Sequence, residues 1–237
     1  MNRIRFISLI LNLDSCDSNI QEYSRLAYVH DLNKLMDENF VSLLLIILKL
    51  AKNSKRLQPT YHNVYLFNLL KSYALSEIDG YVLGHFSRGF VNTLMHYKNA
   101  QYETLESLLS ANNFFEANKF TQQILLELAG EQSKQRNWMY FTDVHSINHQ
   151  SVSDLNHLWE LYSQGNFGFS IQKRIWISVN KNWKKFWKKI GWINSNSKWL
   201  KYPGEFMWAV NAPPGHLPLF NQLRGVYVLE FIFDYYL

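Results

Sequence analysis

Residues 182–191 read Asn-Trp-Lys-Lys-Phe-Trp-Lys-Lys-Ile-Gly, the most strongly patterned stretch of this 237-residue chain. Trp183, Phe186, Trp187 and Ile190 recur with the i, i+3, i+4, i+7 spacing of one helix face, and lysines occupy the opposite side. That spacing predicts an amphipathic α-helix over 182–190, which the glycine at its end stops. We expect the aromatic side to pack against a core and the lysines to face solvent.

The segments before this stretch carry the start and stop signals of three more helices. Asn113 and Ser151 each precede an acidic residue by three positions, which is the pattern of a capping box, and Gly130 and Gly165 supply the ends. A third helix is expected to begin near Ser170. Prolines and glycines concentrate after position 202, so no long helix is expected there.

Residues 1–98 alternate apolar helical stretches with short polar breaks, which predicts a bundle of four or five short antiparallel helices. The basic and apolar stretch 1–14 lacks the small-x-small cleavage site that follows the apolar run of a secretory signal. The apolar run 40–48 is far shorter than the roughly 20 residues of a spanning helix. We therefore expect an all-α protein, with an N-terminal helical bundle over 1–98 and a second helical domain over 99–237.

Tryptophan and positive charge concentrate in the second half of the chain. All eight tryptophans lie between positions 138 and 208, and the stretch between Glu160 and Glu205 holds nine Lys or Arg residues and no acidic residue. Because the formal net charge of the chain is +5, the remainder carries −4. Aromatic area beside cations suits a planar apolar ligand with anionic groups, such as a tetrapyrrole with two propionates, and also a single-stranded nucleic acid.

Spacing divides the tryptophans into two groups. Those at regular helical spacing are predicted to be core residues: Trp159, Trp183 and Trp187. Those in less regular sequence are predicted to be exposed in a cleft: Trp192, Trp199 and Trp208.

Familiar catalytic and metal-binding patterns are absent from the sequence. It contains no P-loop, no G-x-G-x-x-G and no C-x-x-C, and the single Cys16 cannot form an intrachain disulfide. His145, His149 and His157 with Asp143 lack a known ligand spacing, so solvated histidines are the favoured interpretation. Ser170, His216 and Asp143 have the residue types of a triad, but no G-x-S-x-G elbow surrounds the serine. Neither an enzyme nor a metal site is expected.

Four strings of the second half resemble one known family. They are Leu158-Trp159, Ser163-Gln-Gly-Asn-Phe-Gly-Phe-Ser-Ile-Gln-Lys173, Ile190-Gly-Trp192 and Ala212-Pro-Pro-Gly-His-Leu-Pro218. Their order and spacing resemble the genomes-uncoupled family of tetrapyrrole-binding regulators of magnesium chelatase, with the plastid-encoded members of red algae as the closest type. The resemblance covers about residues 100–220.

This resemblance implies a non-enzymatic, all-α "cupped hand" that binds protoporphyrin IX and its magnesium form as ligands, with no cofactor required. It implies a plastid protein that stimulates magnesium chelatase, contacts the large porphyrin-binding subunit of that enzyme and associates peripherally with plastid membranes. Matching motif by motif, one wall of the cleft consists of Phe167, Phe169, Gln172, Lys173 and Trp176. The opposite wall and the mouth consist of Trp192, Trp199, Gly215, His216, Leu217 and Pro218. Arg224, beyond the last matched motif, is added as a partner for a propionate.

Three alternatives stay open at this point. The same basic and aromatic mixture would serve a single-stranded nucleic-acid binder. A peripheral membrane protein could use Trp183, Trp187 and the adjacent lysines as an interfacial amphipathic helix. His216 could be an axial metal ligand, although a hydrogen bond that fixes its loop is the favoured interpretation.

Overall fold

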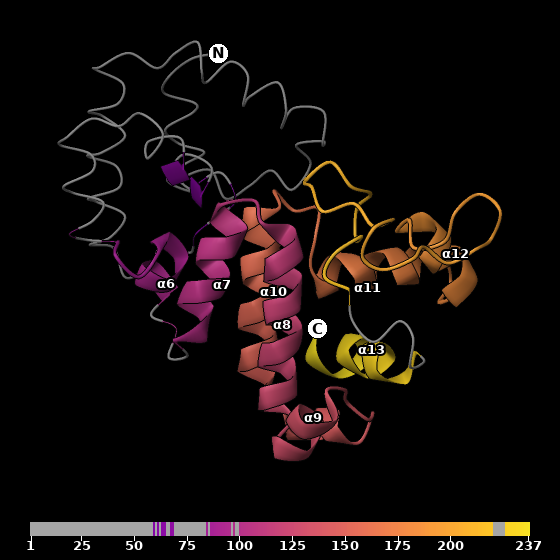
Figure 1. The fold of residues 1–237 in the computed structure, drawn as a ribbon, viewed down its shortest axis with the longest axis horizontal. Helices are drawn as coiled ribbons and strands as arrows, with labels where there is room; N and C mark the ends of the chain where they lie inside the picture. Colours follow the sequence, from indigo (N-terminus) through magenta and orange to yellow (C-terminus); the bar gives the residue numbers. More distant parts are fainter. Residues whose placement is uncertain are drawn as a thin grey trace, which may run out of the picture. The chain divides into compact units, whose positions relative to one another are not determined.

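The chain divides into two compact units, Met1–His96 and Tyr97–Leu237, in the computed structural model (Figure 1). The residues that the structure describes are 59, 61, 63, 64, 67, 68, 84, 86–95, 97, 100–219 and 226–237. In the first unit these include helix α6 (Phe90–Met95), and Phe90 stacks on Phe67 with ring centroids 4.7 Å apart. Most of the bundle expected over 1–98 lies outside the described residues, and the domain division at residue 98 stays a prediction.

Three helices form the body of the second unit: α7 (Gln101–Ser110), α8 (Phe114–Leu128) and α10 (His149–Tyr162). They pack side by side (Figure 1). Leu105 of α7, Ile124 of α8 and Leu158 of α10 are each fully buried. Trp159 is the predicted core residue of α10, and its Nε1 donates a hydrogen bond to Thr121 Oγ1 on α8 at 2.9 Å. The bond satisfies the polar edge of a large ring that otherwise contributes only apolar burial.

One predicted helix cap is confirmed and the other is wrong by three residues. Asn113 caps α8 by accepting a hydrogen bond from the backbone N–H of Glu116 at 3.3 Å. Helix α10 begins at His149, because Asn148 is its cap and accepts from the backbone N–H of Gln150 at 2.8 Å. An Asn side chain that bonds two residues ahead therefore starts the helix before the Ser151 capping pattern is reached.

Helices α11 (Phe169–Ser178) and α12 (Trp183–Lys189) follow. The helix predicted over 182–190 is confirmed. Asn182 caps it by accepting from the backbone N–H of Lys185 at 3.0 Å, and Phe186 and Trp187 are buried on its aromatic side. Four lysines of α12 lie exposed on the opposite side.

The remaining elements are short. They are α9 (Glu131–Arg136), a 3-10 turn (Asp143–Ser146), α13 (Tyr227–Phe231) and a π-helical turn (Ile232–Tyr236). Between α12 and residue 219 the chain has no helix, as the prolines and glycines predict, and only an isolated bridge joins Ile193 to Trp199. Tyr236 is buried, and its hydroxyl donates to the carbonyl of Ile147 at 2.9 Å.

The all-α prediction is confirmed: the part of the chain that the structure describes contains helices and turns but no strand. Within that same part, no helix is long and apolar enough to cross a bilayer.

Candidate ligand-binding surface

Most of the residues that the sequence analysis assigns to a cleft come together in the interior, around the loop 212–219. Gln172 of α11 is fully buried, and its Nε2 donates to the carbonyls of Gly215 at 3.0 Å and Pro218 at 2.9 Å. The backbone N–H of Gly168 donates to the carbonyl of Leu217 at 3.0 Å. The Gln172 side chain and the backbone of Gly168, at the start of α11, therefore hold the loop in place.

His216 is buried and is bonded at both ring nitrogens. Its Nδ1 lies 2.7 Å from the carbonyl oxygen of Ile190, and its Nε2 accepts from the backbone N–H of Met207 at 3.1 Å. A carbonyl can only accept, so the ring is the neutral tautomer with the proton on Nδ1. Burial lowers the pKa of His216, and the Ile190 carbonyl opposes that shift in part. These bonds agree with the favoured loop-fixing interpretation and leave no lone pair for a metal.

Gly215 is required by space and by backbone conformation together. Its φ of +76° lies in the left-handed region, and a Cβ at this position would lie 2.8 Å from Ile175 Cδ1. Its N–H donates to the carbonyl of Asn166 at 2.7 Å. The loop therefore approaches α11 more closely than a side chain would permit.

The end of this loop is attached to α8. The backbone N–H of Leu219 donates to Asn118 Oδ1 at 2.7 Å, and its carbonyl accepts from Gln122 Nε2 at 2.9 Å. Residues 220–225 follow directly and are not among the described residues. The predicted ligand contact Arg224 lies in that segment, outside the described residues.

The exposure predicted for Trp192 is wrong. Its ring is fully buried and stacks on Trp187, with centroids 5.1 Å apart and planes at 9°, and its Nε1 donates to the carbonyl of His216 at 2.8 Å. The irregular sequence around it is a hydrogen-bonded loop rather than an open one, so irregularity was a poor signal of exposure. Trp199 is exposed as predicted, with 44% of its surface accessible.

The predicted cleft walls are therefore a packed layer in this structure. Phe167, Phe169 and Trp176 are buried, with the Trp176 ring 5.5 Å from that of Phe233, while Lys173 is half-buried at the edge of α11. Ligand contact by these residues stays a prediction. Phe167 packs on Phe114 and Trp159, and Trp176 packs on Trp183 and Phe233, so these rings form part of the core of the unit.

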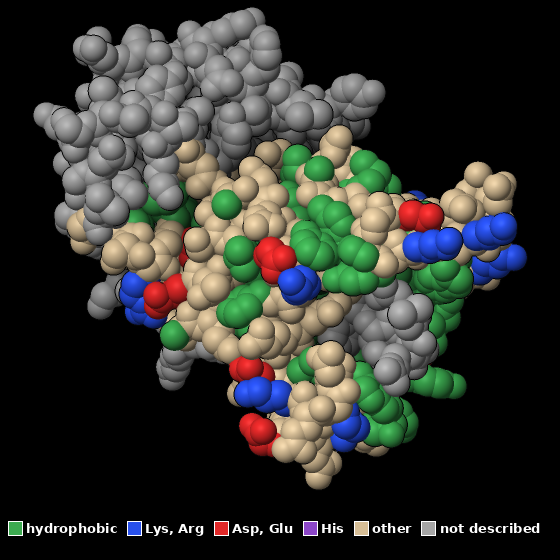
Figure 2. Space-filling view, viewed as in Figure 1, with side chains coloured by type: hydrophobic (Ala, Val, Ile, Leu, Met, Phe, Trp, Pro, Cys, Tyr) green, Lys and Arg blue, Asp and Glu red, His purple; other side chains and the backbone are tan. Residues whose placement is uncertain are grey.

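An exposed aromatic face lies above this layer. It consists of Phe115, Tyr202, Met207 and Trp208: Tyr202 and Met207 are 46% and 44% exposed, and Phe115 and Trp208 are half-buried. The Phe115 and Trp208 rings are 4.9 Å apart, and the Trp208 Nε1 donates to the carbonyl of Pro203 at 3.1 Å. Buried Phe206 links this face to the layer below, since its ring lies 5.5 Å from that of His216. Figure 2 shows hydrophobic side chains gathered on this side of the molecule.

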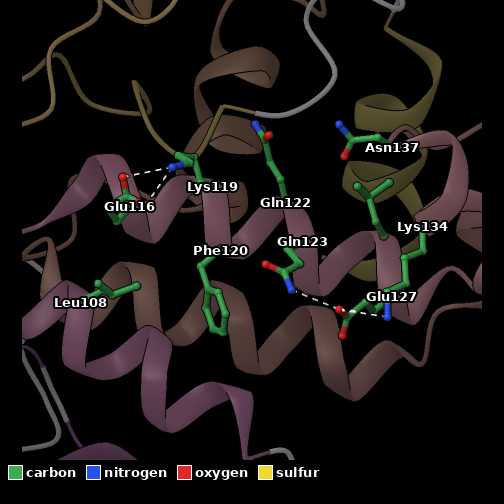
Figure 3. Close-up of a pocket in the computed structure, with 10 residues that line it drawn as sticks. Leu108, Glu116, Lys119, Phe120, Gln122, Gln123, Glu127, Lys134 and Asn137 are labelled. Atoms are coloured by element: carbon green, nitrogen blue, oxygen red, sulfur yellow. Dashed lines mark hydrogen bonds and ion pairs between the residues drawn. The ribbon is translucent and has the colours of Figure 1, made fainter.

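A hollow of about 710 Å³ runs along α8 beside the aromatic face (Figure 3). Its polar lining includes Lys119 and Lys134 with the acidic Glu116 and Glu127, and its apolar lining includes Phe120. Lys119 connects the two features, because its Nζ lies 5.2 Å from the centroid of the Phe115 ring. The same Nζ is 3.0 Å from a carboxylate oxygen of Glu116, and both side chains are about half exposed, so this pair is weak.

A second exposed aromatic group flanks the other end of the undescribed segment 220–225. Tyr227 at the start of α13 is 71% exposed and lies 6.2 Å from the ring of Phe141, which is 54% exposed. Tyr140 is also exposed, and the Arg136 guanidinium lies 4.6 Å from its ring centroid.

Sequence reasoning missed the aromatic face except for Trp208. One signal was available: two adjacent phenylalanines in a helix cannot share a face, so if Phe114 is buried Phe115 must point elsewhere. Tyr202 and Met207 had no such signal, because they lie in a loop without periodicity.

The metal and triad patterns do not assemble. Within the described residues, no group of three or more His, Cys, Asp or Glu side chains could hold a metal. Asp143 instead accepts from Ser133 Oγ at 2.8 Å, and His157 Nδ1 lies 3.0 Å from the Tyr97 hydroxyl. The Ser170 hydroxyl bonds Glu160, while His216 is bonded only to backbone groups through its ring.

Comparison with known proteins decides the family. The profile described as GUN4-like matches residues 96–235, which is more than half of the chain and nearly all of the second unit. The chain belongs to the GUN4-like family. It is 47% identical over 160 residues to the ycf53 protein of Porphyra purpurea, covering 68% of this chain and 66% of that one.

More distant members are similar as well. A protein of Arabidopsis thaliana called "Tetrapyrrole-binding protein, chloroplastic" is 32% identical over 142 residues, covering 56% of this chain and 54% of that one. The solved structure of GUN4 from Chlamydomonas reinhardtii aligns with a TM-score of 0.53 and 40% identity, covering 56% of this chain and 86% of that structure. The chain thus aligns with slightly less than two thirds of the Porphyra relative and about half of the Arabidopsis one.

Proposed function

We propose that this protein binds protoporphyrin IX and its magnesium form on the surface made by the aromatic face and the α8 hollow. The observation that carries the proposal is the cluster of half-buried Phe115 and Trp208 with exposed Tyr202 and Met207, beside a hollow lined by two lysines and two glutamates. Exposed aromatics of this kind mark a binding surface in a domain that buries most of its large side chains. The name of the Arabidopsis relative supports the same ligand class.

The chemistry of the surface fits a porphyrin in two ways. The rings offer flat apolar area, whose removal from water contributes on the order of 25 cal/mol per Å². Lys119, between the rings and the hollow, offers a cation to a propionate at the edge of the macrocycle. The hollow, at about 710 Å³, is in the range of small-molecule sites.

The buried layer has a second part in this proposal. Gln172, His216 and Trp192 fix the loop 212–219, and His216 also holds the backbone of Met207. These hydrogen bonds thereby determine the position of the aromatic face. Lys173 and Trp199, which remain accessible at its edge, and Arg224 in the undescribed segment are proposed to complete the cationic and aromatic rim.

Bound porphyrin would be passed to or held for magnesium chelatase. We propose that the protein has no chemistry of its own, acts in the plastid, and stimulates the chelatase through the large porphyrin-binding subunit. Metal insertion then remains a step of the chelatase.

Porphyrin titration of the full chain tests the binding. Tryptophan emission and the Soret band are followed as protoporphyrin IX is added at micromolar concentrations. We expect quenching and a spectral shift in the wild type and at least tenfold weaker binding for Trp208→Ala, since truncating a large aromatic contact costs more than about 1.4 kcal/mol. Ile177→Ala is the matched control, because Ile177 is a 51% exposed apolar residue on α11 outside this surface. Equal porphyrin affinity of the two variants would show that the porphyrin binds outside the aromatic face.

Reconstituted magnesium chelatase tests the role. Formation of magnesium protoporphyrin is measured with and without the protein at limiting porphyrin. Stimulation by the wild type and by Ile177→Ala, but not by Trp208→Ala, is expected. Porphyrin binding without stimulation would support the proposed ligand and contradict the proposed role at the chelatase.

A further inference from the structure

The lysines on and around α12 form a surface that holds positive charge only. The segment 161–204 contains no acidic residue, and its lysines at this surface are all exposed. We define the cationic face as Lys181, Lys184, Lys185, Lys188, Lys189 and Lys198. Figure 2 shows Lys and Arg side chains gathered at the end of the second unit where Figure 1 places α12.

These charges are almost uncompensated. Among the residues that the structure describes, one ion pair involves the cationic face, between Lys181 and Asp234 at 3.7 Å, and both side chains are more than half exposed. Lys189 Nζ donates to a neutral group, Ser178 Oγ of α11, at 3.1 Å. A surface of one sign raises the local concentration of anionic partners.

An exposed tryptophan lies at the edge of this face. Trp199 is 44% exposed, and its ring packs on that of Trp187 of α12 with centroids 5.6 Å apart. Lys184 precedes Trp187 by three positions on the helix, so the two side chains are neighbours, and Lys198 directly precedes Trp199. The surface thus offers a flat apolar ring next to cations.

The ring of Trp199 is held on packed aromatic rings. Trp187, beneath it, stacks on buried Trp192 at 5.1 Å and on half-buried Trp183 at 5.1 Å. The backbone N–H of Leu200 donates to the carbonyl of Trp192 at 3.0 Å, which ties the neighbouring backbone to the same layer. A ring fixed in this way loses little conformational freedom when a ligand stacks on it.

The combination of cations and an exposed ring selects among anionic partners. An acidic peptide pairs with lysines through its carboxylates and does not require the flat ring of Trp199. A single-stranded nucleic acid uses both features, because phosphates repeat along its backbone and its unpaired bases stack on aromatic side chains. In a duplex the bases already stack on one another, so only the phosphates remain for this surface.

We infer that the cationic face and Trp199 bind single-stranded nucleic acid without sequence preference. The lysines meet the phosphates, and a base stacks on the ring of Trp199. Phosphates and base faces are common to RNA and DNA, so the two kinds of strand are expected to bind alike. This binding does not depend on the proposed porphyrin site, because the cationic face shares no residue with the aromatic face or the hollow and no porphyrin is needed to measure it.

Fluorescence anisotropy of labelled oligonucleotides with the full chain tests this binding. The probes are polyuridylate and polythymidylate of about 15 nucleotides, near the upper site size of one single-strand-binding fold, and a duplex of the same length. We expect both single strands to bind more tightly than the duplex. Duplex binding as tight as single-strand binding would overturn the inference. Similar affinity for the two single strands supports contact through phosphates and base faces, and a preference above about tenfold would contradict it.

The salt dependence measures the phosphate contacts. Each phosphate that is neutralised on a single strand contributes about −0.7 to the slope of log affinity against log salt concentration. If about five lysines meet phosphates, the slope is about −3.5, which is about a hundredfold loss of affinity between about 50 and 200 mM NaCl. An affinity that does not change with salt would rule out the cationic face as the contact.

Substitution of the ring tests the stacking. Trp199→Ala should weaken single-strand binding at least about fivefold, the low end of what one base stack contributes, and leave duplex binding nearly unchanged. Trp199→Phe should stay within about threefold of the wild type, because stacking needs only an aromatic face. Tyr235→Ala is the matched control, since Tyr235 is a 60% exposed aromatic residue outside this surface. Equal affinity of Trp199→Ala and Tyr235→Ala would mean that no base stacks on Trp199.

A pair of charge-matched variants locates the phosphate contacts. Lys185→Gln/Lys188→Gln and Gln132→Glu/Gln135→Glu each remove two units of net charge, and all four positions are exposed, on α12 and α9 respectively. We expect the α12 pair to reduce the steepness of the salt slope by about 1.4, the value for two phosphates, and the α9 pair to leave it unchanged. Equal changes in the two pairs would mean that net charge alone acts.

A competition experiment separates nucleic acid from acidic protein. Unlabelled polyuridylate should displace the labelled strand at a lower concentration of charge than polyglutamate does, because polyglutamate has no base to stack. Displacement by polyglutamate at the same concentration of charge would assign the cationic face to an acidic protein instead. Near-ultraviolet circular dichroism checks that each variant keeps the packed tryptophans.

Discussion

The Nδ1 atom of His216 lies 2.7 Å from the carbonyl oxygen of Ile190, the residue that ends α12. The same ring accepts from the backbone N–H of Met207, in the aromatic face, through Nε2 at 3.1 Å. One neutral imidazole therefore joins the end of a helix to the proposed ligand surface. A proton added at Nε2 would make this nitrogen a donor, and it could no longer accept from the Met207 N–H. Both hydrogen bonds of the ring therefore form only while the imidazole is neutral.

Acid should weaken the fold through His216. Burial lowers the pKa of the folded ring from its usual 6.5, so the unfolded chain takes up this proton at a higher pH than the folded one. The stability contributed by the neutral ring is complete above about pH 6.5 and is lost as the pH falls through the folded pKa. Urea unfolding at pH 7.5 and 5.5 should show a drop in the free energy of unfolding. His216→Gln should show a smaller drop, and an unchanged drop would assign the effect to other groups.

Gly215→Ala should destabilise the second unit by about 1–3 kcal/mol, the usual cost of forcing extra volume into a packed site. The new Cβ would lie 2.8 Å from Ile175 Cδ1, and the φ of +76° is unfavourable for alanine. Gly204→Ala is the matched control, since a Cβ there meets nothing within 4 Å. Thermal or urea unfolding of the two variants compares them directly, and equal midpoints would show that the loop 212–219 shifts to make room.

Trp192→Phe should lower stability more than it lowers porphyrin affinity, because Trp192 supports the loop 212–219 and does not itself lie in the aromatic face. The change removes the 2.8 Å hydrogen bond to the His216 carbonyl and part of a ring stacked at 5.1 Å on Trp187, a loss of about 1–3 kcal/mol. Porphyrin binding is followed at the Soret band, because the variant also changes tryptophan emission. A large loss of affinity with normal stability would return Trp192 to the ligand site.

Helix type and helix faces could be predicted from the sequence, because both follow from spacing along one segment. The stripe of Trp183, Phe186 and Trp187 predicted a buried side, and Phe186 and Trp187 are buried. The start of α10 was misplaced because two capping patterns compete within four residues, and the hydrogen bond that Asn148 Oδ1 accepts from the backbone N–H of Gln150 decides between them.

The proposed ligand surface was harder to predict than the helices. Spacing carries no information on residues 190–219, where exposure is set by long-range hydrogen bonds such as Gln172 to Pro218. Trp192 and Trp208 have similar local sequence irregularity, yet the first is tied into the core and the second lies in the aromatic face. Motif resemblance pointed to residues 163–218 without separating the buried residues of that segment from those that face solvent.

Lys119→Met should weaken binding of protoporphyrin IX by up to about fivefold, because an exposed ion pair contributes about 0.2–1 kcal/mol. The ligand offers its own control: protoporphyrin IX dimethyl ester has the same macrocycle and no carboxylate. If Lys119 meets a propionate beside the Phe115 ring, the substitution should reduce affinity for the free acid and leave affinity for the ester unchanged. Equal losses for both ligands would mean that the lysine stem acts by packing, and no loss for either would place the propionates away from α8.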